Sequence, residues 1–467
     1  MKIEQIYTGC LAQGAYYIES NGEVAIIDPL REVDDYISRA DKDGAKIKYI
    51  FETHFHADFV SGHVTLAEKT GATIVYGPTA VTGFDSLVAE DNQEFKVGDL
   101  TIKLLHTPGH TMECSSFLLI DENGKNHCLF SGDTLFLGDV GRPDLAQKAA
   151  TMTQEELAGM LYDSLRTKIM PLADDLIVYP GHGAGSACGK NMMKETVDTL
   201  GNQKRTNYAL RGDMTREEFI TELTDGLAPP PAYFPMNVKM NKEGYSNLED
   251  VISKGSRALS PTEFEVTANE TEAIILDTRN ETVFVDGFIP QSIFIGIDGS
   301  FAPWVGALIR DTQHPILLVT DDDRLEEVIT RLSRVGFDNT IGYLKGGFDA
   351  WKNENREIDT LRSVSPSNFE MEVKENNLSV FDVRKKGEWD TLHLENANHI
   401  CLSGINENLA QFPQNQDFYV HCAGGYRSVI ASSILKMRGY HNVINIAEGF
   451  TEIQKTNLPT KSVVTSN

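Results

Sequence analysis

A strand-like run followed by metal-ligand residue types places the strongest constraint on this chain. The largely apolar run of Ile47, Tyr49, Ile50 and Phe51 predicts a strand. Residues 53–59, which read Thr-His-Phe-His-Ala-Asp-Phe, follow it after one further residue. His54, His56 and Asp58 occupy alternate positions in this segment. Ligand types clustered at one strand end can be presented to a single point in space. The motif therefore predicts a metal centre at the end of a strand.

The first 200 residues have the pattern of a layered α/β fold. Strand-like runs at 24–28, 73–76 and 117–120 alternate with polar, Gly-rich turns, and a helical pattern follows near Glu155. The next 50 residues are polar, contain three consecutive prolines and have one predicted helix near 216–223. We interpret this segment as a terminal extension with a linker.

Three further ligand types lie on Gly-containing turns after strand-like runs. His110 is in Thr-Pro-Gly-His-Thr, Asp133 in Phe-Ser-Gly-Asp-Thr, and His182 in Tyr-Pro-Gly-His-Gly. Glycine in such a turn lets the backbone approach a ligand closely. A lone histidine of this kind is more often structural, but these three elements in this order, after the first motif, resemble the metallo-β-lactamase superfamily. The resemblance implies an N-terminal αββα sandwich.

Within that superfamily the chain is most similar to the persulfide dioxygenases, a branch near glyoxalase II that binds one iron. The first motif of the superfamily usually ends in a histidine of a second metal site, and here that position is Phe59. The resemblance implies one Fe(II) per chain, with zinc less favoured, bound by His54, His110 and Asp133. Two imidazoles and one carboxylate would leave open positions for substrate and O2.

The resemblance gives supporting roles to the remaining ligand types. His56, Asp58 and His182 are expected to orient the ligands or to position oxygen intermediates. The alternative is that they form hydrogen bonds that only anchor the loops.

Two residues near the predicted centre have open roles. Arg142, in Gly-Arg-Pro-Asp, either holds an anionic substrate or pairs with Asp144. Cys188 lies in the Gly-rich segment that follows His182. It either carries sulfur as a persulfide beside the iron or is a small buried thiol.

An internal repeat of about 100 residues occupies the second half of the chain. Asp277 and Arg279 in the first copy match Asp382 and Arg384 in the second, and each copy has a Gly-Phe pair near its end. Each copy also has an apolar strand followed by a predicted helix, which indicates a small parallel α/β domain present twice. The expected domains are 1–250, 251–360 and 361–467.

A cysteine loop in the last copy is the second predicted site. Cys422 lies between a strand and a helix-like segment, where loop N–H groups and the helix dipole favour a thiolate and would hold a persulfide. The domain resembles rhodanese sulfurtransferases, which implies that Cys422 and Arg427 are catalytic. Phosphatases of related architecture normally have one more residue between Cys and Arg. The predicted persulfide-binding loop is Ala423, Gly424, Gly425, Tyr426 and Arg427.

The first copy departs from this pattern. Its strand ends in Val319-Thr320-Asp321-Asp322, and we expect Asp321 at the position that Cys422 occupies in the second copy. Without a thiol, and with carboxylates that would repel anionic sulfur, the copy is predicted to be an inactive rhodanese-like domain that serves as a spacer or docking element.

Bulk composition excludes several classes of protein. The net charge is −26, which disfavours nucleic-acid binding through phosphate contacts. We expect no transmembrane helix, because no apolar run is long enough to form one. We also expect no signal peptide, because the first ten residues lack its basic and apolar regions. Six cysteines without paired spacing favour a reduced protein, so we predict a cytoplasmic location without membrane contact.

The combined resemblance implies a persulfide dioxygenase fused to an inactive and then an active rhodanese domain. The expected partners are a thiol persulfide, O2 and sulfite, and the superfamily often forms homodimers or homotetramers. The expected products are sulfite and then thiosulfate. One alternative is a glyoxalase II-type thioester hydrolase with an attached sulfurtransferase. Another is a sulfur carrier or sensor that loads sulfur without turnover.

Overall fold

The computed structural model describes residues 1–145, 152–227, 229–376 and 378–463. It consists of two compact units. The first contains residues 1–248 and 333–336, and the second contains the remainder of the chain from residue 249. Within the described ranges, no helix is both long enough and apolar enough to cross a membrane.

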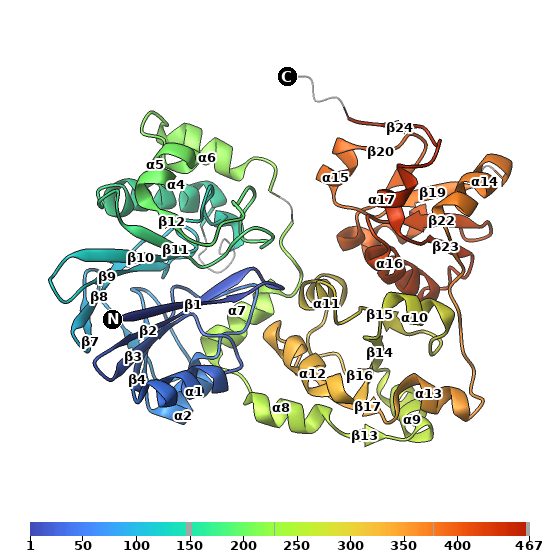
Figure 1. Ribbon diagram of the computed structural model, residues 1–467, viewed down its shortest axis with the longest axis horizontal. Helices are drawn as coiled ribbons and strands as arrows, with labels where there is room; N and C mark the ends of the chain where they lie inside the picture. Colours follow the sequence, from blue (N-terminus) through green and yellow to red (C-terminus); the bar gives the residue numbers. More distant parts are fainter. Residues whose placement is uncertain (146–151, 228, 377, 464–467) are drawn as a thin grey trace. The chain divides into compact units, whose positions relative to one another are not determined.

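Two six-stranded sheets form the centre of the first unit (Figure 1). The strands of the first sheet, in spatial order, are β1 (Lys2–Thr8), β2 (Gln13–Ser20), β3 (Glu23–Ile27), β4 (Lys46–Phe51), β5 (Thr73–Tyr76) and β6 (Leu87–Val88). This sheet is antiparallel up to β3 and parallel from β3 to β6. The strands of the second sheet, in sequence order, are β7 (Glu94–Val97), β8 (Leu100–His106), β9 (Ser115–Ile120), β10 (Asn126–Gly132), β11 (Ile177–Pro180) and β12 (Asp198–Thr199), and they are neighbours in this same order. Only β10 and β11 are parallel neighbours in this second sheet.

Helices cover the outer face of each sheet and give the layer order helix, sheet, sheet, helix. Tyr36 and Leu66 pack on the first sheet, whereas Leu161, Leu200 and Phe219 pack on the second. This arrangement confirms the predicted αββα sandwich. The helices of this unit are α1 (Asp34–Asp43), α2 (His63–Thr70), η1 (Pro143–Leu145), α4 (Gln154–Ser164), η2 (Leu165–Ile169), α5 (Leu200–Thr206), η3 (Tyr208–Leu210), α6 (Arg216–Thr224) and α7 (Phe234–Glu243).

The residue pattern of β2 explains why the sheets are buried on both faces. Tyr16 and Ile18 belong to the core between the two sheets, while the alternate residues Ala15 and Tyr17 belong to the core under the helices. Successive side chains of a strand point to opposite faces. A continuous apolar run is therefore the expected sequence for a strand with a core on each side.

The second unit contains two five-stranded parallel sheets with the same topology (Figure 1). The first sheet, in spatial order, is β13 (Ala258–Leu259), β17 (Thr340–Leu344), β16 (Ile316–Val319), β14 (Ile274–Asp277) and β15 (Ile293–Phe294). The second is β18 (Ser363–Val364), β23 (Val443–Ile446), β22 (Phe418–His421), β19 (Ser379–Asp382) and β21 (Asn398–His399). The matching order confirms that the sequence repeat is a repeated α/β domain.

Short helices connect these strands, and a small antiparallel pair, β20 (His393–Leu394) with β24 (Thr460–Lys461), lies in the second copy. The helices of the first copy are α8 (Leu248–Gly255), α9 (Pro261–Thr271), α10 (Glu281–Asp286), α11 (Phe301–Leu308), η4 (Asp322–Arg324), α12 (Leu325–Arg334) and α13 (Gly347–Asn353). Those of the second copy are α14 (Pro366–Asn376), α15 (Lys386–Thr391), η5 (Leu402–Glu407), η6 (Leu409–Gln411), α16 (Tyr426–Met437) and α17 (Gly449–Ile453).

The segment from 201 to 250 is more ordered than we expected from its sequence. Instead of one helix and a linker, its described residues contribute to α5, α6, α7 and α8. Phe219 and Leu223 of α6 are buried in the core of the second sheet. The extension is therefore an integral layer of the first unit.

Candidate functional site

Three loops bring His54, His110 and Asp133 together at the ends of strands. His54 follows β4, His110 follows β8, and Asp133 follows β10. All three side chains are buried, and their ligand atoms lie within 4.8 Å of one another. The Oδ2 atom of Asp133 is 3.4 Å from His110 Nε2 and 3.8 Å from His54 Nε2. These are the three residues that the sequence resemblance assigned to the metal.

Hydrogen bonds on the far side of each imidazole leave Nε2 facing the cluster. The Thr53 hydroxyl donates to Asp28 Oδ2 at 2.8 Å, so it accepts from His54 Nδ1 at 2.9 Å. His110 Nδ1 donates to the backbone oxygen of Arg142 at 2.8 Å. A histidine that donates through Nδ1 keeps the Nε2 lone pair available for a metal. Sequence reasoning missed both Asp28 and the Arg142 carbonyl.

The protonation states also suit metal binding. Burial, with a further contribution from His56, lowers the pKa of His54 well below its ordinary value, so this imidazole is neutral. Burial opposes the ionisation of Asp133, but His182, His54 and His110 together lower its pKa and keep it a carboxylate. Asp133 Oδ2 is buried without a hydrogen-bond partner among the described residues. Two imidazoles and an unsatisfied carboxylate oxygen therefore fit a divalent cation.

His182 connects this cluster to Asp58. Its Nδ1 is 2.8 Å from Asp133 Oδ1, and its Nε2 is 2.8 Å from Asp58 Oδ2. Burial alone would lower the pKa of His182, but the two carboxylates raise it well above its ordinary value. A protonated His182 held between two carboxylates fixes the orientation of Asp133 and turns its other oxygen toward His54 and His110.

Cys188 lies beside this ion pair. Its Sγ forms a second compact group with ligand atoms of Asp58 and His182, all within 4.8 Å. Burial, then the negative charges of Asp58 and Asp133, raise the pKa of Cys188 well above its ordinary value, so the residue is a protonated thiol. Because both nitrogens of His182 already face carboxylates, this second group is less available to a metal than the first.

The second site lies at the end of β22, the central strand of the last sheet. The thiol of Cys422 is buried, and the backbone N–H of Gly425 donates to its Sγ at 3.1 Å. Gly425 immediately precedes α16, so the sulfur lies at the start of a helix. Loop N–H groups and the helix dipole both favour negative charge at this sulfur.

Both arginines near the Cys422 loop are paired with carboxylates. Arg427 contacts Glu388 at 2.6 and 2.8 Å through its two terminal nitrogens. Arg384 makes a similar contact with the buried Asp382. The hydrogen bond from Arg427 lowers the pKa of Glu388, so this partner remains charged at neutral pH. An anionic ligand in the loop would have to compete with Glu388 for the Arg427 guanidinium.

Comparison with known proteins places both sites in families. A family model described as the metallo-beta-lactamase superfamily matches residues 8–182, and a rhodanese-like domain model matches residues 260–354 and 365–456. The cytoplasmic hydroxyacylglutathione hydrolase of Arabidopsis thaliana is 31% identical over 39% of this chain and 67% of its own length. A crystal structure of a metallo-beta-lactamase from Staphylococcus aureus subsp. aureus COL has 32% identity and a TM-score of 0.65, and the match covers 74% of this chain and 98% of that one.

The chain belongs to the metallo-β-lactamase superfamily. Its second half consists of two rhodanese-like domains. Another relative, the hydroxyacylglutathione hydrolase GloC of Haemophilus influenzae, is 28% identical over 44% of this chain and 97% of its own length.

The second histidine of the metallo-β-lactamase motif, His56, contacts carboxylates outside the candidate ligand cluster. His56 Nε2 faces two carboxylates, at 3.1 Å from Asp28 Oδ1 and 3.6 Å from Glu52 Oε2. The ring of Phe59, at the end of the motif, lies 4.3 Å from the His56 ring between centroids. The Nε2 atom of His56 therefore contacts carboxylates that do not belong to the cluster of His54, His110 and Asp133. Phe59 has no donor atom for a metal.

A residue from the C-terminal extension of this domain supports the motif. The buried side-chain amide of Asn241, on α7, donates to the backbone oxygens of His56 and Phe59 at 2.8 Å each. Its oxygen accepts from the Ser61 N–H at 2.8 Å. Nothing in the local sequence pattern singled out Asn241, because its role depends on a contact between residues 182 or more positions apart.

Arg142 forms a bidentate pair with Asp144, with both hydrogen bonds at 2.7 Å. Of the two open roles, the structure favours the structural pair. The backbone of the same residue nevertheless reaches the ligand cluster, through its carbonyl contact with His110.

The first rhodanese-like domain, which has no cysteine and which we call the silent domain for that reason, requires one correction. In the parallel ladders, Asp277 pairs with Val319, and the equivalent Asp382 pairs with His421. The residue that follows Val319 therefore corresponds to Cys422, and that residue is Thr320 rather than Asp321. The expected position was wrong by one residue, but the conclusion that this copy has no thiol stands.

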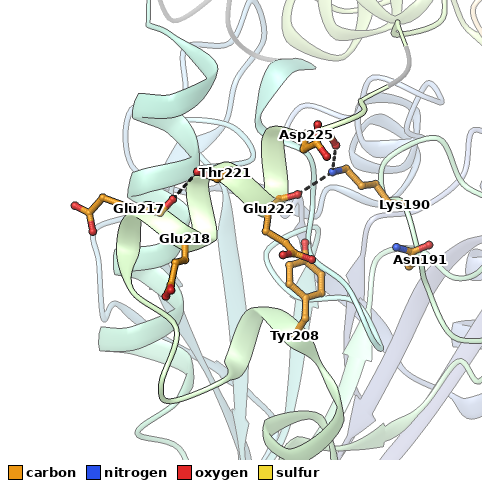
Figure 2. A pocket seen from close by; sticks show the side chains of 8 residues that line it. All are labelled: Lys190, Asn191, Tyr208, Glu217, Glu218, Thr221, Glu222 and Asp225. Carbon is orange, nitrogen blue, oxygen red and sulfur yellow. Dashed lines mark hydrogen bonds between the residues drawn. The ribbon is translucent and has the colours of Figure 1, made fainter. Parts of the chain in front are cut away.

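A cavity of about 760 Å³ lies elsewhere on the first unit (Figure 2). It is lined mainly by residues of α6 and by Lys190, whose ammonium donates to the Glu222 and Asp225 backbone oxygens. Four of its eight lining residues are carboxylates, and it shares no residue with the ligand cluster. We therefore place the chemistry at the strand-end cluster.

Proposed function

We propose that the metallo-β-lactamase domain is an iron-dependent persulfide dioxygenase and that the Cys422 domain is a sulfurtransferase. The first reaction converts a low-molecular-weight thiol persulfide, O2 and water into the thiol, sulfite and two protons. In the second, the Cys422 thiolate attacks the outer sulfur of another thiol persulfide, whose S–S bond breaks so that the thiol leaves and Cys422 becomes a persulfide. Sulfite then attacks the outer sulfur of the Cys422 persulfide, the S–S bond to Cys422 breaks, and thiosulfate leaves while Cys422 keeps the electron pair as a thiolate.

The donor set of His54, His110 and Asp133 carries this proposal. Two imidazoles and one carboxylate are the donors of non-haem Fe(II) oxygenases, and they leave coordination positions open. Fe(II) bound there would carry electrons from the persulfide sulfur, which is oxidised to sulfite, to O2. Phe59 supports a single metal because it replaces a donor of the usual second site.

The surrounding residues have defined tasks in this reaction. Thr53 and the Arg142 carbonyl hold the two imidazoles with Nε2 directed at the cluster. His182 holds a proton between Asp58 and Asp133 and keeps the carboxylate of Asp133 in one orientation. The buried setting of the cluster limits access of water, which would otherwise weaken these electrostatic contacts.

The presence of both sites in one chain supports the coupled reaction. Sulfite produced in one domain would be released at a high effective concentration relative to the tethered sulfurtransferase. Without such coupling, sulfite would leave by diffusion and thiosulfate formation would depend on its bulk concentration.

Metal content and oxygen uptake test the proposal. We expect protein purified without added metal to contain about one iron per chain and to consume O2 when glutathione persulfide is added, in keeping with the donor set. Zinc in the same site, with no persulfide-dependent oxygen uptake, would contradict the dioxygenase proposal.

A thioester hydrolase is the second candidate, and the names of the curated relatives favour it. The proteins from Arabidopsis thaliana and Haemophilus influenzae are both named hydroxyacylglutathione hydrolases. In such a reaction, water activated at the metal would attack a thioester carbonyl. Hydrolysis of S-lactoylglutathione, measured beside oxygen uptake on the same preparation, separates the two candidates.

Glu388→Gln is expected to improve the binding of anionic sulfur compounds at the Cys422 loop. The substitution removes the carboxylate that competes for Arg427. Since the pair is partly exposed, we expect a modest change, a fall of about threefold in the KM for thiosulfate at low salt. The effect should diminish at high ionic strength. Glu395→Gln, at an exposed position in the same domain, is the control for net charge. An unchanged or higher KM in Glu388→Gln would show that Arg427 does not bind the anion.

A further inference from the structure

The Cys422 loop is anchored in the silent rhodanese-like domain through Tyr426. The phenol hydroxyl of Tyr426 donates to the backbone oxygen of Gly296 at 2.7 Å. The Tyr426 ring also packs edge-on against Phe294, with ring centroids 5.9 Å apart. Tyr426 is the first residue of α16, whereas Gly296 and Phe294 belong to the other copy of the repeat, at and just after β15.

Two glycines form the seat for this ring. A Cβ atom on Gly299 would lie 2.2 Å from Tyr426 Cζ, and its three nearest atoms all belong to that ring. A Cβ atom on Gly296 would lie 3.2 Å from Tyr426 Cε2. Contacts below 3 Å cannot persist without movement, so glycine at position 299 is what lets the ring enter.

A second contact holds the same helix further along. Ser433, seven residues after Tyr426 and on the same face of α16, accepts a hydrogen bond from the backbone N–H of Phe294 at 3.0 Å. The β15 segment of the silent domain therefore holds α16 at its first residue and again two turns later.

In the sequence, Tyr426 lies between the two residues that are expected to stabilise the sulfur of Cys422. Gly425, immediately before Tyr426, donates its N–H to Cys422 Sγ, and Arg427 follows immediately. A rotation or shift at the start of α16 would move the N–H donor and the guanidinium relative to the sulfur. Positions of such donors within a few tenths of an ångström decide how well they stabilise developing charge.

We propose that the silent domain positions the Cys422 loop, with Tyr426 as the positioning residue and residues 296–299 as its seat. The inference rests on the proposed sulfurtransferase function of Cys422 and gives the domain without a thiol a specific task. On this view the two copies act as one sulfur-transfer module rather than as an enzyme and a passive spacer.

The substitution Gly299→Ala, which lies in the domain without a thiol, tests the proposal. The added methyl group displaces the Tyr426 ring, and we expect kcat for sulfur transfer to fall about tenfold with a smaller change in KM, as for a geometric misplacement. The rate of Cys422 alkylation by iodoacetamide, followed by mass spectrometry, should fall in parallel. Persulfide-dependent oxygen uptake and the unfolding temperature should remain those of the unmodified chain.

A double-mutant cycle separates positioning from general damage to the fold. In a Tyr426→Ala background the added methyl group meets no ring, so Gly299→Ala should cause no further loss. Arg310→Ala, which breaks the Arg310–Glu407 contact between the same two copies without touching the loop, should leave transfer and alkylation unchanged. Additive losses in the double variant, or an equal loss in Arg310→Ala, would overturn the proposal.

The alkylation rate keeps this inference distinct from the proposed function. If the unmodified protein transfers no sulfur, the sulfurtransferase assignment fails, yet the effect of Gly299→Ala on Cys422 reactivity is still measurable. If transfer is normal and neither kcat nor alkylation responds to Gly299→Ala, the positioning role fails and the sulfurtransferase assignment is unaffected.

Discussion

Asp133→Asn is expected to remove the metal from the first unit and to reduce persulfide-dependent oxygen uptake by more than about a hundredfold. Loss of a residue that only forms a hydrogen bond to a metal ligand can lower metal affinity or activity up to about a hundredfold, and loss of a ligand should have a larger effect. The amide keeps the shape of the side chain but removes the one anionic donor in the cluster. It also removes a carboxylate that holds His182 in its charged form. Iron per chain after desalting, together with oxygen-electrode traces, provides the measurement.

Asp213→Asn is a suitable control, because Asp213 is an exposed carboxylate of the same unit that pairs with Arg211. This variant should retain metal and activity. The Asp133→Asn variant should still transfer sulfur from thiosulfate through Cys422, which shows that the rest of the chain is folded. Full iron occupancy in Asp133→Asn would mean that the metal is held elsewhere, with the Asp58, His182 and Cys188 group as the first place to look.

The candidate ligand set could be predicted from sequence because each of its residues follows a strand in a short motif, and the motifs together resemble one superfamily. The local pattern around His54, His110 and Asp133 gives both the strand and the turn, and their order in the chain matches one superfamily. The partners that orient these side chains have no such local motif and could not be predicted in this way. Asp28 reaches Thr53 across 25 positions, and Arg142 contributes a backbone oxygen that has no side-chain signature.

The helical extension was predicted only in part, because the expected helix near 216–223 corresponds to α6, whereas α5 and α7 were not expected. Thr215 and Glu218 form a capping box at the start of α6, with the side chain of each accepting from the backbone of the other. The spacing of Thr and Glu is a known sign of a helix start. The burial of Asn241 beneath the metal-site motif could not be inferred in this way, because it follows from how α7 packs and not from its own sequence.

The repeat illustrates the limit of counting along the chain. The offsets between matched motifs are 105 for Asp277 and Asp382 and 102 for Gly347 and Gly449. Spacing alone therefore places the counterpart of Cys422 only to within a few residues, and the expected Asp321 required a small gap. Strand register resolves the position, because a shift of one residue turns every side chain to the opposite face. With Thr320 at that position, the first copy has a hydroxyl where the second copy has the sulfur of Cys422.

Cys422→Ser is expected to abolish thiosulfate formation while oxygen uptake remains near that of the unmodified protein. A serine oxygen cannot form the S–S bond that holds sulfane sulfur, so sulfite from the first reaction should accumulate in place of thiosulfate. Chromatographic measurement of sulfite and thiosulfate during oxygen uptake checks both parts of this expectation. The loss should reach the limit of detection, because no other step in the proposed sequence forms a protein persulfide.

Cys401→Ser is the matched control, since Cys401 is a partly exposed thiol of the same domain whose Sγ contacts Ser403 at 3.3 Å. It should form thiosulfate at the normal rate. A loss of oxygen uptake in Cys422→Ser would contradict two separable sites and would mean that sulfur must pass through Cys422 before oxidation. Thiosulfate formation that survives in Cys422→Ser would instead direct attention to Cys188, a thiol that lies beside the predicted metal centre.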